Sequence, residues 1–286
     1  MSVILGILFG ALAVILPLVS FVVWGFVFMK LFRYSSEQFP QTIFLRGWGA
    51  TARYISIGMI PLFIIAASLL SAGISIVFEM IFMVIVSLIL SAQGGIALVL
   101  SLMSAGPIEE SAKLLCSAMI YMLIFLVWKS RPEMSKERNR IKDGMIIGLI
   151  AGSSFGLLES VLYLFSGFDL LLTSSPTIST VDPIVWRITL GVSIHALWTG
   201  ISSTGLGRST LKRKLGYSAV FLMVAVVFHS LNNGVQGFFY YILDMKGTTG
   251  LVITDIIQFS MVVMGIVIFI LLWKKAKKKE GAHDVR

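Results

Sequence analysis

The sequence is poor in charged residues and in cysteine, and each shortage excludes some classes of protein. Charged side chains make up 13% of its 286 residues, about half of the roughly 25% that is typical of a soluble domain. Hydrophobic residues make up 57%, and the mean hydropathy is +0.94. The single cysteine, Cys116, excludes an intramolecular disulfide and a metal site made only of cysteines. The composition therefore indicates an integral membrane protein without a separate soluble domain.

Two patterns are also missing from the chain. No His-Glu-x-x-His segment is present, which argues against the ordinary zinc-protease arrangement on a single helix. The sequence has no internal repeat either, whereas many transporters are built from two related halves with paired broken helices. These absences leave the chemistry to be read from individual polar residues.

Apolar runs long enough to cross a bilayer follow one another along the chain. The densest basic segment, 129–142, predicts a cytoplasmic loop, and four spans counted from it place the basic segments 208–214 and 274–279 on the same side. Upstream, helix breaks near 71–73 and 93–95 favour four further spans. We therefore predict an all-α polytopic membrane protein with about eight transmembrane helices, and seven as the alternative count.

The chain is predicted to be a single membrane domain over residues 1–286. Its polar motifs lie within 107–233, and residues 274–286 are predicted to form a basic cytoplasmic tail. The formal charge of +9 is concentrated in short loops between apolar runs. This distribution indicates that the basic residues face the cytoplasmic leaflet of the bilayer and do not bind nucleic acid.

Three ionisable residues stand together inside one apolar run: Glu109, Glu110 and Lys113. Each costs roughly 2.5 to 3.5 kcal/mol at bilayer depth. Glu109 and Lys113 are spaced for an ion pair on one helix face, while Glu110 is rotated by about 100°. We expect Gly106-Pro107 to kink or restart the helix just before them. An unpaired Glu110 in low dielectric suits a general base, so we favour it over Glu109.

Further polar residues lie inside three later spans: Glu159, His195 and His229, with Asn233 one turn after His229. Polar groups in hydrocarbon face the bundle interior and pair with one another, so we expect one polar cavity. Such a set can bind a divalent metal, or it can activate water by general-base chemistry without one. Glu79, in an earlier span, is predicted to make an interhelical hydrogen bond or to face a pore.

Four short motifs follow one another in this order: Pro107-Ile-Glu109-Glu110-Ser-Ala-Lys113, Phe155-Gly-Leu-Leu-Glu159, His195-Ala-Leu-Trp198-Thr199-Gly200 and His229-Ser-Leu-Asn232-Asn233. Together they resemble the PrsW-type intramembrane proteases, which belong to a broader group that includes the CAAX-processing enzymes. One departure is Ser160, which stands where this family commonly has asparagine after the glutamate.

The resemblance implies a helical membrane endopeptidase that cuts a membrane-anchored protein or peptide with an activated water. It implies four catalytic residues, which are Glu109, Glu110, His195 and His229. It also implies three supporting residues, which are Lys113, Glu159 and Asn233. If a metal takes part, zinc is the candidate ion and Glu159, His195 and His229 are its candidate ligands. Otherwise the two histidines stabilise the oxyanion.

The location implied by this resemblance is a prokaryotic cell membrane, with the basic loops and the tail in the cytoplasm. The expected partners are the lipid bilayer and the membrane-anchored substrate, and no nucleic acid. Two alternatives use the same residues: a proton- or cation-coupled transporter, and a catalytically silent membrane scaffold.

Overall fold

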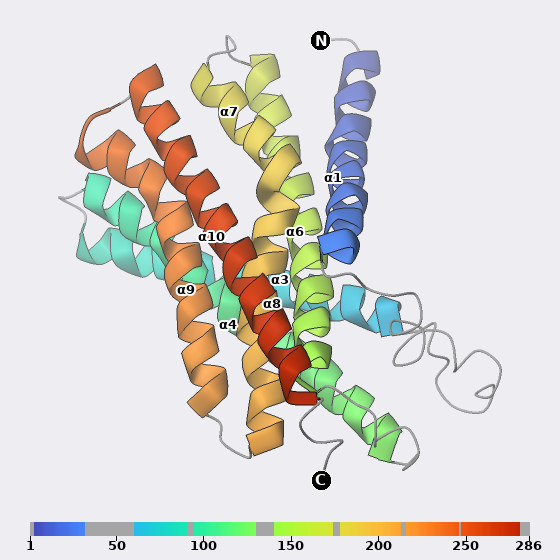
Figure 1. The fold of residues 1–286 in the computed structure, drawn as a ribbon. Helices are drawn as coiled ribbons and strands as arrows, with labels where there is room; N and C mark the ends of the chain where they lie inside the picture. The colour runs from blue at the N-terminus through green and yellow to red at the C-terminus, as the bar shows by residue number, and fades with distance from the viewer. Residues whose placement is uncertain are drawn as a thin grey trace.

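The computed structural model describes residues 3–31, 60–90, 94–129, 140–173, 178–212, 216–245 and 247–280, and its regular elements are all helices (Figure 1). In chain order the elements are α1 (Val3–Leu31), α3 (Ile60–Ile89), α4 (Gly94–Lys129), α6 (Arg140–Thr173), α7 (Ile178–Trp186), the π-helix η3 (Arg187–Gly191), α8 (Val192–Lys212), α9 (Gly216–Gly237), the π-helix η4 (Phe238–Ile242) and α10 (Thr248–Glu280). The predicted all-α class is confirmed.

Membrane-crossing length is reached by most of these helices. Among the described residues, six helical stretches are long and apolar enough to cross a membrane. A seventh long helix is α4, which has 36 residues and carries Glu109, Glu110 and Lys113. Seven long helices correspond to the alternative count. The basic segment predicted at 129–142 lies mostly outside the described residues.

One predicted helix break, near 71–73, is wrong, because α3 runs unbroken through it. Ser68 and Ser71 are buried there. The Ser71 hydroxyl donates to the main-chain oxygen of Ser68 in the same helix (2.8 Å), and the Ser68 hydroxyl donates to the main-chain oxygen of Ala151 on α6 (3.2 Å). These small residues therefore let two helices pack closely. The break predicted near 93–95 is confirmed, since α4 begins at Gly94.

Helix α4 also continues through Gly106 and Pro107, so the predicted restart does not occur. Gly106 is instead a contact point with α9. A Cβ atom built on Gly106 would lie 2.1 Å from the Ser230 hydroxyl oxygen and 2.7 Å from the Ser230 nitrogen. The absence of a side chain at Gly106 thus brings the glutamate motif close to the helix that carries His229.

Helix α8 lies at the centre of the bundle, and its residues 192–205 are all buried. Gly152 of α6 lies against it so closely that a Cβ there would be 2.2 Å from the main-chain oxygen of His195. Trp198, one turn after His195 on α8, belongs to an apolar cluster that includes Phe269 of α10. Contacts with α6 and α10 therefore fix the position of this part of α8.

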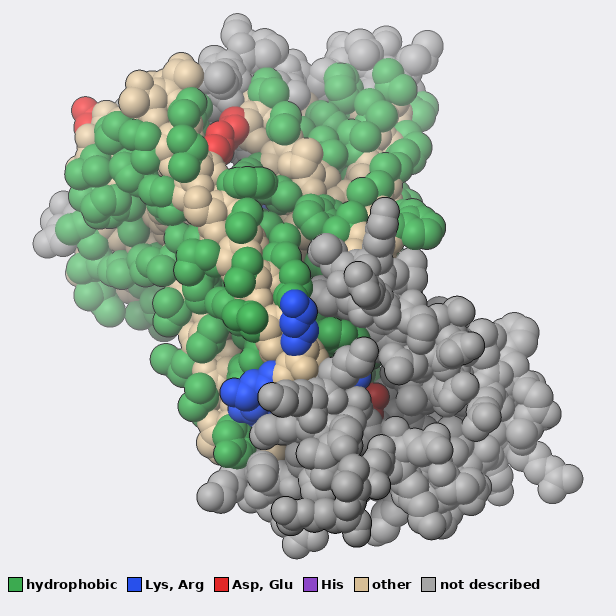
Figure 2. All heavy atoms as spheres, in the orientation of Figure 1, with side chains coloured by type: hydrophobic (Ala, Val, Ile, Leu, Met, Phe, Trp, Pro, Cys, Tyr) green, Lys and Arg blue, Asp and Glu red, His purple; other side chains and the backbone are tan. Residues whose placement is uncertain are grey.

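Large apolar side chains cover the face of the bundle shown in Figure 2, and many are more than half exposed, such as Leu88, Val220 and Leu271. The buried side chains include glutamates, a lysine and two histidines. An apolar exterior around a polar interior is the arrangement expected of an integral multi-pass membrane protein. The start of α6 and the ends of α8 and α10 lie at the same end of the bundle (Figure 1), as the predicted order of spans requires.

Candidate active site

A cavity of about 200 Å³ lies inside the bundle and is lined by side chains from α3, α4 and α6 to α10. Its polar lining consists of Glu79, Ser101, Glu109, Glu159, Asp182, Arg187, His195, His229, Asn232, Asn233, Gln236 and Gln258. Residues that are far apart in the sequence therefore meet in one polar chamber, as predicted. Among the predicted site residues, Glu110 and Lys113 are packed behind the cavity wall and do not line it.

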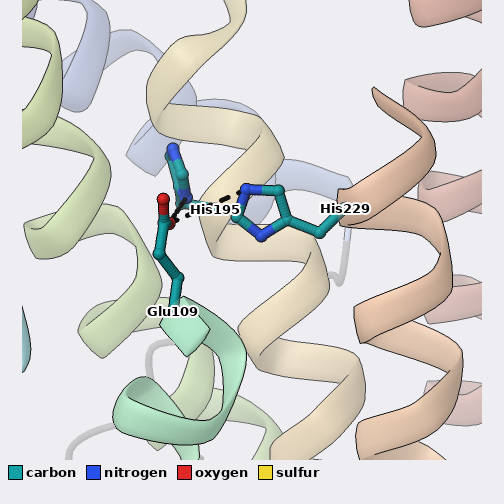
Figure 3. Close-up of side chains that lie close together, drawn as sticks. All are labelled: Glu109, His195 and His229. Atoms are coloured by element: carbon teal, nitrogen blue, oxygen red, sulfur yellow. Dashed lines mark ion pairs between the residues drawn. The ribbon is translucent and has the colours of Figure 1, made fainter. Parts of the chain in front are cut away.

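Glu109, His195 and His229 form the centre of the chamber, and they come from α4, α8 and α9 (Figure 3). Their side chains are each between 1% and 4% exposed. The Oε2 atom of Glu109 is 3.6 Å from Nδ1 of His195 and 3.7 Å from Nε2 of His229. One oxygen and two ring nitrogens therefore converge on a common point.

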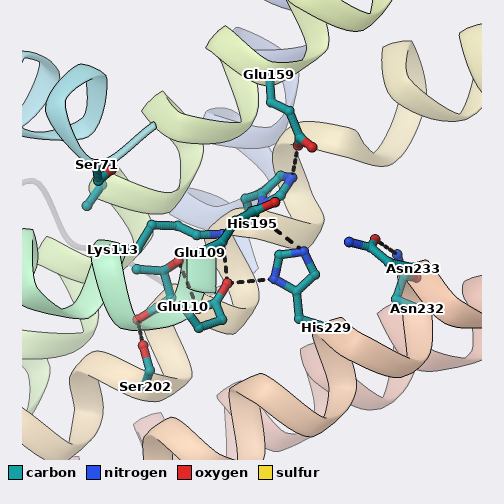
Figure 4. A network of polar contacts seen from close by, with 12 residues as sticks. Ser71, Glu109, Glu110, Lys113, Glu159, His195, Ser202, His229, Asn232 and Asn233 are labelled. Carbon is teal, nitrogen blue, oxygen red and sulfur yellow. Dashed lines mark hydrogen bonds and ion pairs between the residues drawn. The ribbon is translucent and has the colours of Figure 1, made fainter. Parts of the chain in front are cut away.

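The second nitrogen of each histidine is held by a second carboxylate. Nε2 of His195 contacts Glu159 on α6, and Nδ1 of His229 is 2.9 Å from Oε1 of Glu110. The Thr199 hydroxyl donates to Oε2 of Glu110 at 3.3 Å. Figure 4 shows Glu159 beyond the ring of His195 and Glu110 between Lys113 and the ring of His229. A carboxylate on one nitrogen fixes the ring orientation and leaves the other nitrogen for a ligand or substrate.

Lys113 joins the two glutamates of α4. Its ammonium nitrogen is 3.0 Å from Oε2 of Glu109, 2.7 Å from Oε1 of Glu110 and 2.9 Å from Nδ1 of His195. The side chain is 1% exposed and lies 4.2 Å from the centre of the Phe155 ring. The predicted ion pair with Glu109 is present, and Glu110 shares the same ammonium instead of being left unpaired.

Arg187 is a site residue that the sequence reasoning missed. Its Nη1 atom is 2.7 Å from Oε2 of Glu159, and its guanidinium carbon lies 3.9 Å from the centre of the Tyr163 ring. It begins the π-helix η3, and π-helical turns are frequent at functional sites. The available signal was an arginine inside an apolar span, eight residues before His195.

The remaining polar predictions also meet at this chamber. Glu79 of α3 lines the cavity together with Glu109 of α4. Asn233 lines the cavity one turn beyond His229. Ser160, at the position of the family departure, donates a hydrogen bond to the main-chain oxygen of Arg187 at 3.3 Å, so it supports the turn at η3.

The central cluster fits a divalent metal ion. Ligand atoms of Glu109, His195 and His229 all lie within 4.8 Å of one another. Zinc bonds of about 2.0 to 2.1 Å at tetrahedral angles would separate such atoms by about 3.4 Å, close to the 3.6 and 3.7 Å found here. The predicted set used Glu159 in place of Glu109, but Glu159 contacts the far nitrogen of His195.

The charges around the cluster favour a cation as well. Glu79, Glu109, Glu110 and Glu159 supply four carboxyl groups, whereas Lys113 and Arg187 supply two cations. With neutral histidines the acidic groups outnumber the cations, and uncompensated negative charge is costly in a low-dielectric interior. Lys113 donates to the same Glu109 and His195 atoms that an ion would use. Because Nδ1 of His195 has a single lone pair, an ion would have to displace the ammonium from that nitrogen.

Comparisons with known proteins agree with this site. The model of the PrsW family of intramembrane metalloproteases matches residues 56–272, which include all of α3, α4, α6, α7, α8 and α9 and most of α10. A search of curated proteins and a search of solved structures each found no match. The family match covers more than half of the chain and every residue of the chamber described above.

Proposed function

Because the chain belongs to the PrsW family of intramembrane metalloproteases, we propose that it hydrolyses a peptide bond in a membrane-anchored protein, using the chamber around Glu109, His195 and His229. The observation that carries this proposal is the pairing of each histidine with a carboxylate on one ring nitrogen, while the other nitrogen faces Glu109. This geometry orients both rings toward one reaction point.

We assign contact with the attacking water to Glu109 and not to Glu110, which was favoured on the sequence alone. Glu109 lines the cavity, whereas Glu110 is fully buried behind it and already contacts Lys113, His229 and Thr199. A carboxylate that reaches the cavity can take a proton from water and return it to the leaving amine. Glu110 then acts by orienting His229.

Each remaining residue of the chamber has a distinct task in this proposal. Glu159 holds the ring of His195, and Arg187 holds Glu159. The Asn233 amide lines the cavity and supplies a neutral N–H donor for the substrate carbonyl oxygen as negative charge develops on it. The surrounding helices exclude bulk water, which strengthens these interactions.

A divalent ion, with zinc as the candidate, would be held by Oε2 of Glu109 and by His195 and His229, and the proton-transfer role would then fall to the other carboxylate oxygen of Glu109. When bound, the ion would act as a Lewis acid that polarises the substrate carbonyl and activates water at neutral pH. The donor set of one carboxylate oxygen and two imidazole nitrogens suits zinc. No observation on the described residues favours the transporter or the scaffold alternative.

The test compares membranes from cells that produce the wild-type protein with membranes from cells that produce Glu109→Gln. Mass spectrometry of newly formed protein N-termini locates cleavage sites even when the substrate is unidentified. We expect cleavage sites in or beside membrane spans that depend on the wild-type protein, are lost in Glu109→Gln and are retained in Glu280→Gln, a control at the end of α10. Identical N-termini in wild type and Glu109→Gln would overturn the proposal.

A further inference from the structure

One face of α9 carries a line of neutral polar residues that the reaction described above does not fully use. After His229 come Asn232, Asn233 and Gln236, at spacings of three, four and seven residues. These spacings place them on one side of a helix, and all four line the cavity. Seven residues of α-helix rise by about 10 Å. We call Asn232, Asn233 and Gln236 the amide stripe.

The buried side-chain amide of Asn232 has an atom without a hydrogen-bond partner among the described residues. The residue is 4% exposed, and its Oδ1 atom has no hydrogen-bond partner within the described part of the chain. Its Nδ2 atom makes only a long contact of 3.5 Å with Oδ1 of Asn233. If the amide is turned over, the nitrogen becomes the unpartnered atom. In either orientation, one buried polar atom of this cavity-lining residue lacks a partner within the described ranges of the chain.

The position of Asn232 is nonetheless fixed. Gln258 of α10 also lines the cavity, and its Nε2 atom donates to the main-chain oxygen of Asn232 at 2.8 Å. Figure 4 shows Asn232 and Asn233 on α9 just beyond His229. An unsatisfied amide in an apolar interior is costly, so it is seldom left without a partner. A rigidly held but unsatisfied amide beside a reaction centre indicates a ligand site.

The hydrogen-bonding groups of the amide stripe indicate what kind of ligand it binds. Amides are neutral and offer both a donor and an acceptor, so they match the N–H and C=O groups of a peptide main chain. A membrane-anchored substrate must unwind to be cut, and its freed main-chain groups then need partners because hydrocarbon supplies none. The stripe rises about 6 Å from Asn232 to Gln236, and an extended chain rises about 3.3 Å per residue, so about two substrate residues would lie along it.

We propose that the amide stripe, with Asn232 as its central acceptor, binds the main chain of the substrate in extended form beside the scissile bond. This site recognises peptide N–H groups and not particular side chains. The inference rests on the proposed proteolytic function, which it deepens by assigning how the unwound substrate is held.

Two dye-labelled hexapeptides test the proposal: one of alternating leucine and alanine, and the same peptide with N-methyl groups on its alanines. N-methylation removes N–H donors and leaves the side chains unchanged. Binding to the purified full-length protein is measured by fluorescence anisotropy, in a period during which mass spectrometry shows the peptide intact. The proteins compared are wild type, Asn232→Leu and the control Ser260→Leu, an exposed position of α10.

In the wild-type protein and in Ser260→Leu, we expect N-methylation to weaken binding by about tenfold, which is the effect of one net hydrogen bond. Asn232→Leu should bind the parent peptide about tenfold more weakly and respond to N-methylation by less than about threefold. A third peptide that alternates valine and serine should bind wild type within about threefold of the parent, because the site reads the main chain.

Equal penalties for N-methylation in wild type and Asn232→Leu would overturn the proposal, as would equal binding of both peptides by wild type. The N-methyl comparison on wild type needs no variant, so it remains decisive if Asn232→Leu does not fold. Peptide binding is measured without cleavage. A wild-type protein that cleaves membrane substrates but binds no peptide contradicts only this inference, whereas binding without Glu109-dependent cleavage contradicts only the proposed function.

Discussion

At the scale of single residues, the arrangement of the two histidines decides the chemistry. His195 and His229 lie with ring centres 5.2 Å apart, and each is held from behind by its own carboxylate. Glu159 and Glu110 do not supply ligand atoms to the central cluster. Each should affect metal binding by orienting the histidine ring that it contacts. Their loss should weaken metal binding without removing the site.

Glu159→Gln and Glu110→Gln test this role. Amides of similar shape keep the packing but lose the charge that orients each imidazole and strengthens it as a ligand, so we expect zinc affinity to fall by about 10- to 100-fold in each variant. Zinc titration against a competing chelator measures this, with Glu280→Gln as the control. Unchanged affinity in both variants would show that these carboxylates serve only the fold.

Asp182 provides a pH-dependent test outside the spans. Burial, and then the neighbouring Asp255 carboxyl, raise the pKa of Asp182 from 3.8 to about 6. A raised pKa means that the fold favours the protonated form, so this stability is present at low pH and is lost as the pH rises through about 6. Asp182→Asn removes the charge that forms at high pH.

We therefore expect Asp182→Asn to raise the unfolding temperature at pH 8 and to change it little at pH 4. Thermal unfolding in detergent at the two pH values is the measurement. A shift of equal size at both pH values would contradict the assigned cause, because it would show that the effect does not follow the ionisation of this carboxyl group.

Sequence reasoning identified most residues of the site but could not rank them. Buried ionisable groups in apolar runs are conspicuous, so Glu109, His195 and His229 could be found without a structure. The sequence favoured Glu110 over Glu109 as the general base, but α4 is apolar on all sides and its pattern does not show which face meets the cavity. Arg187 was missed because its partner, Glu159, is 28 residues away and on another helix.

At the scale of helices, glycines and other small residues set the distances between the helices that carry the site. The spans after 140 were predicted well, since basic segments and long apolar runs delimit them. The break predicted at 71–73 was wrong because a run of small residues can end a helix or let it pack closely, and only the partner helix decides which. The same reasoning makes individual glycines testable.

Gly152→Ala and Gly73→Ala form a matched pair. A Cβ at Gly152 would meet the His195 main-chain oxygen at 2.2 Å and displace α6 from α8, whereas a Cβ at Gly73 meets nothing within 4 Å. We expect Gly152→Ala to lose about 1 to 3 kcal/mol of stability together with most activity. Gly73→Ala should be neutral or stabilised by up to about 1 kcal/mol. Thermal unfolding and peptide cleavage measure both effects, and equal behaviour of the two variants would contradict this packing.

At the scale of the whole molecule, the chain encloses a charged centre inside an apolar exterior. Seven long helices of the described chain surround or support the chamber, and their outer residues include many exposed leucine, isoleucine and phenylalanine side chains. Such a fold delivers water and catalytic groups to a peptide bond at membrane depth, where neither is otherwise available. The central claim is that Glu109, His195 and His229 hold a divalent metal for this hydrolysis.

The most direct test is the metal content of the full-length protein, purified without a polyhistidine tag and measured by elemental mass spectrometry alongside peptide cleavage. We predict about one divalent ion per wild-type chain, retention of the ion in His283→Gln, and loss of both ion and cleavage in His195→Phe and His229→Phe. Cleavage should also stop when a chelator removes the ion and resume when zinc is returned. A metal-free wild-type protein that still cleaves its substrate would contradict the claim.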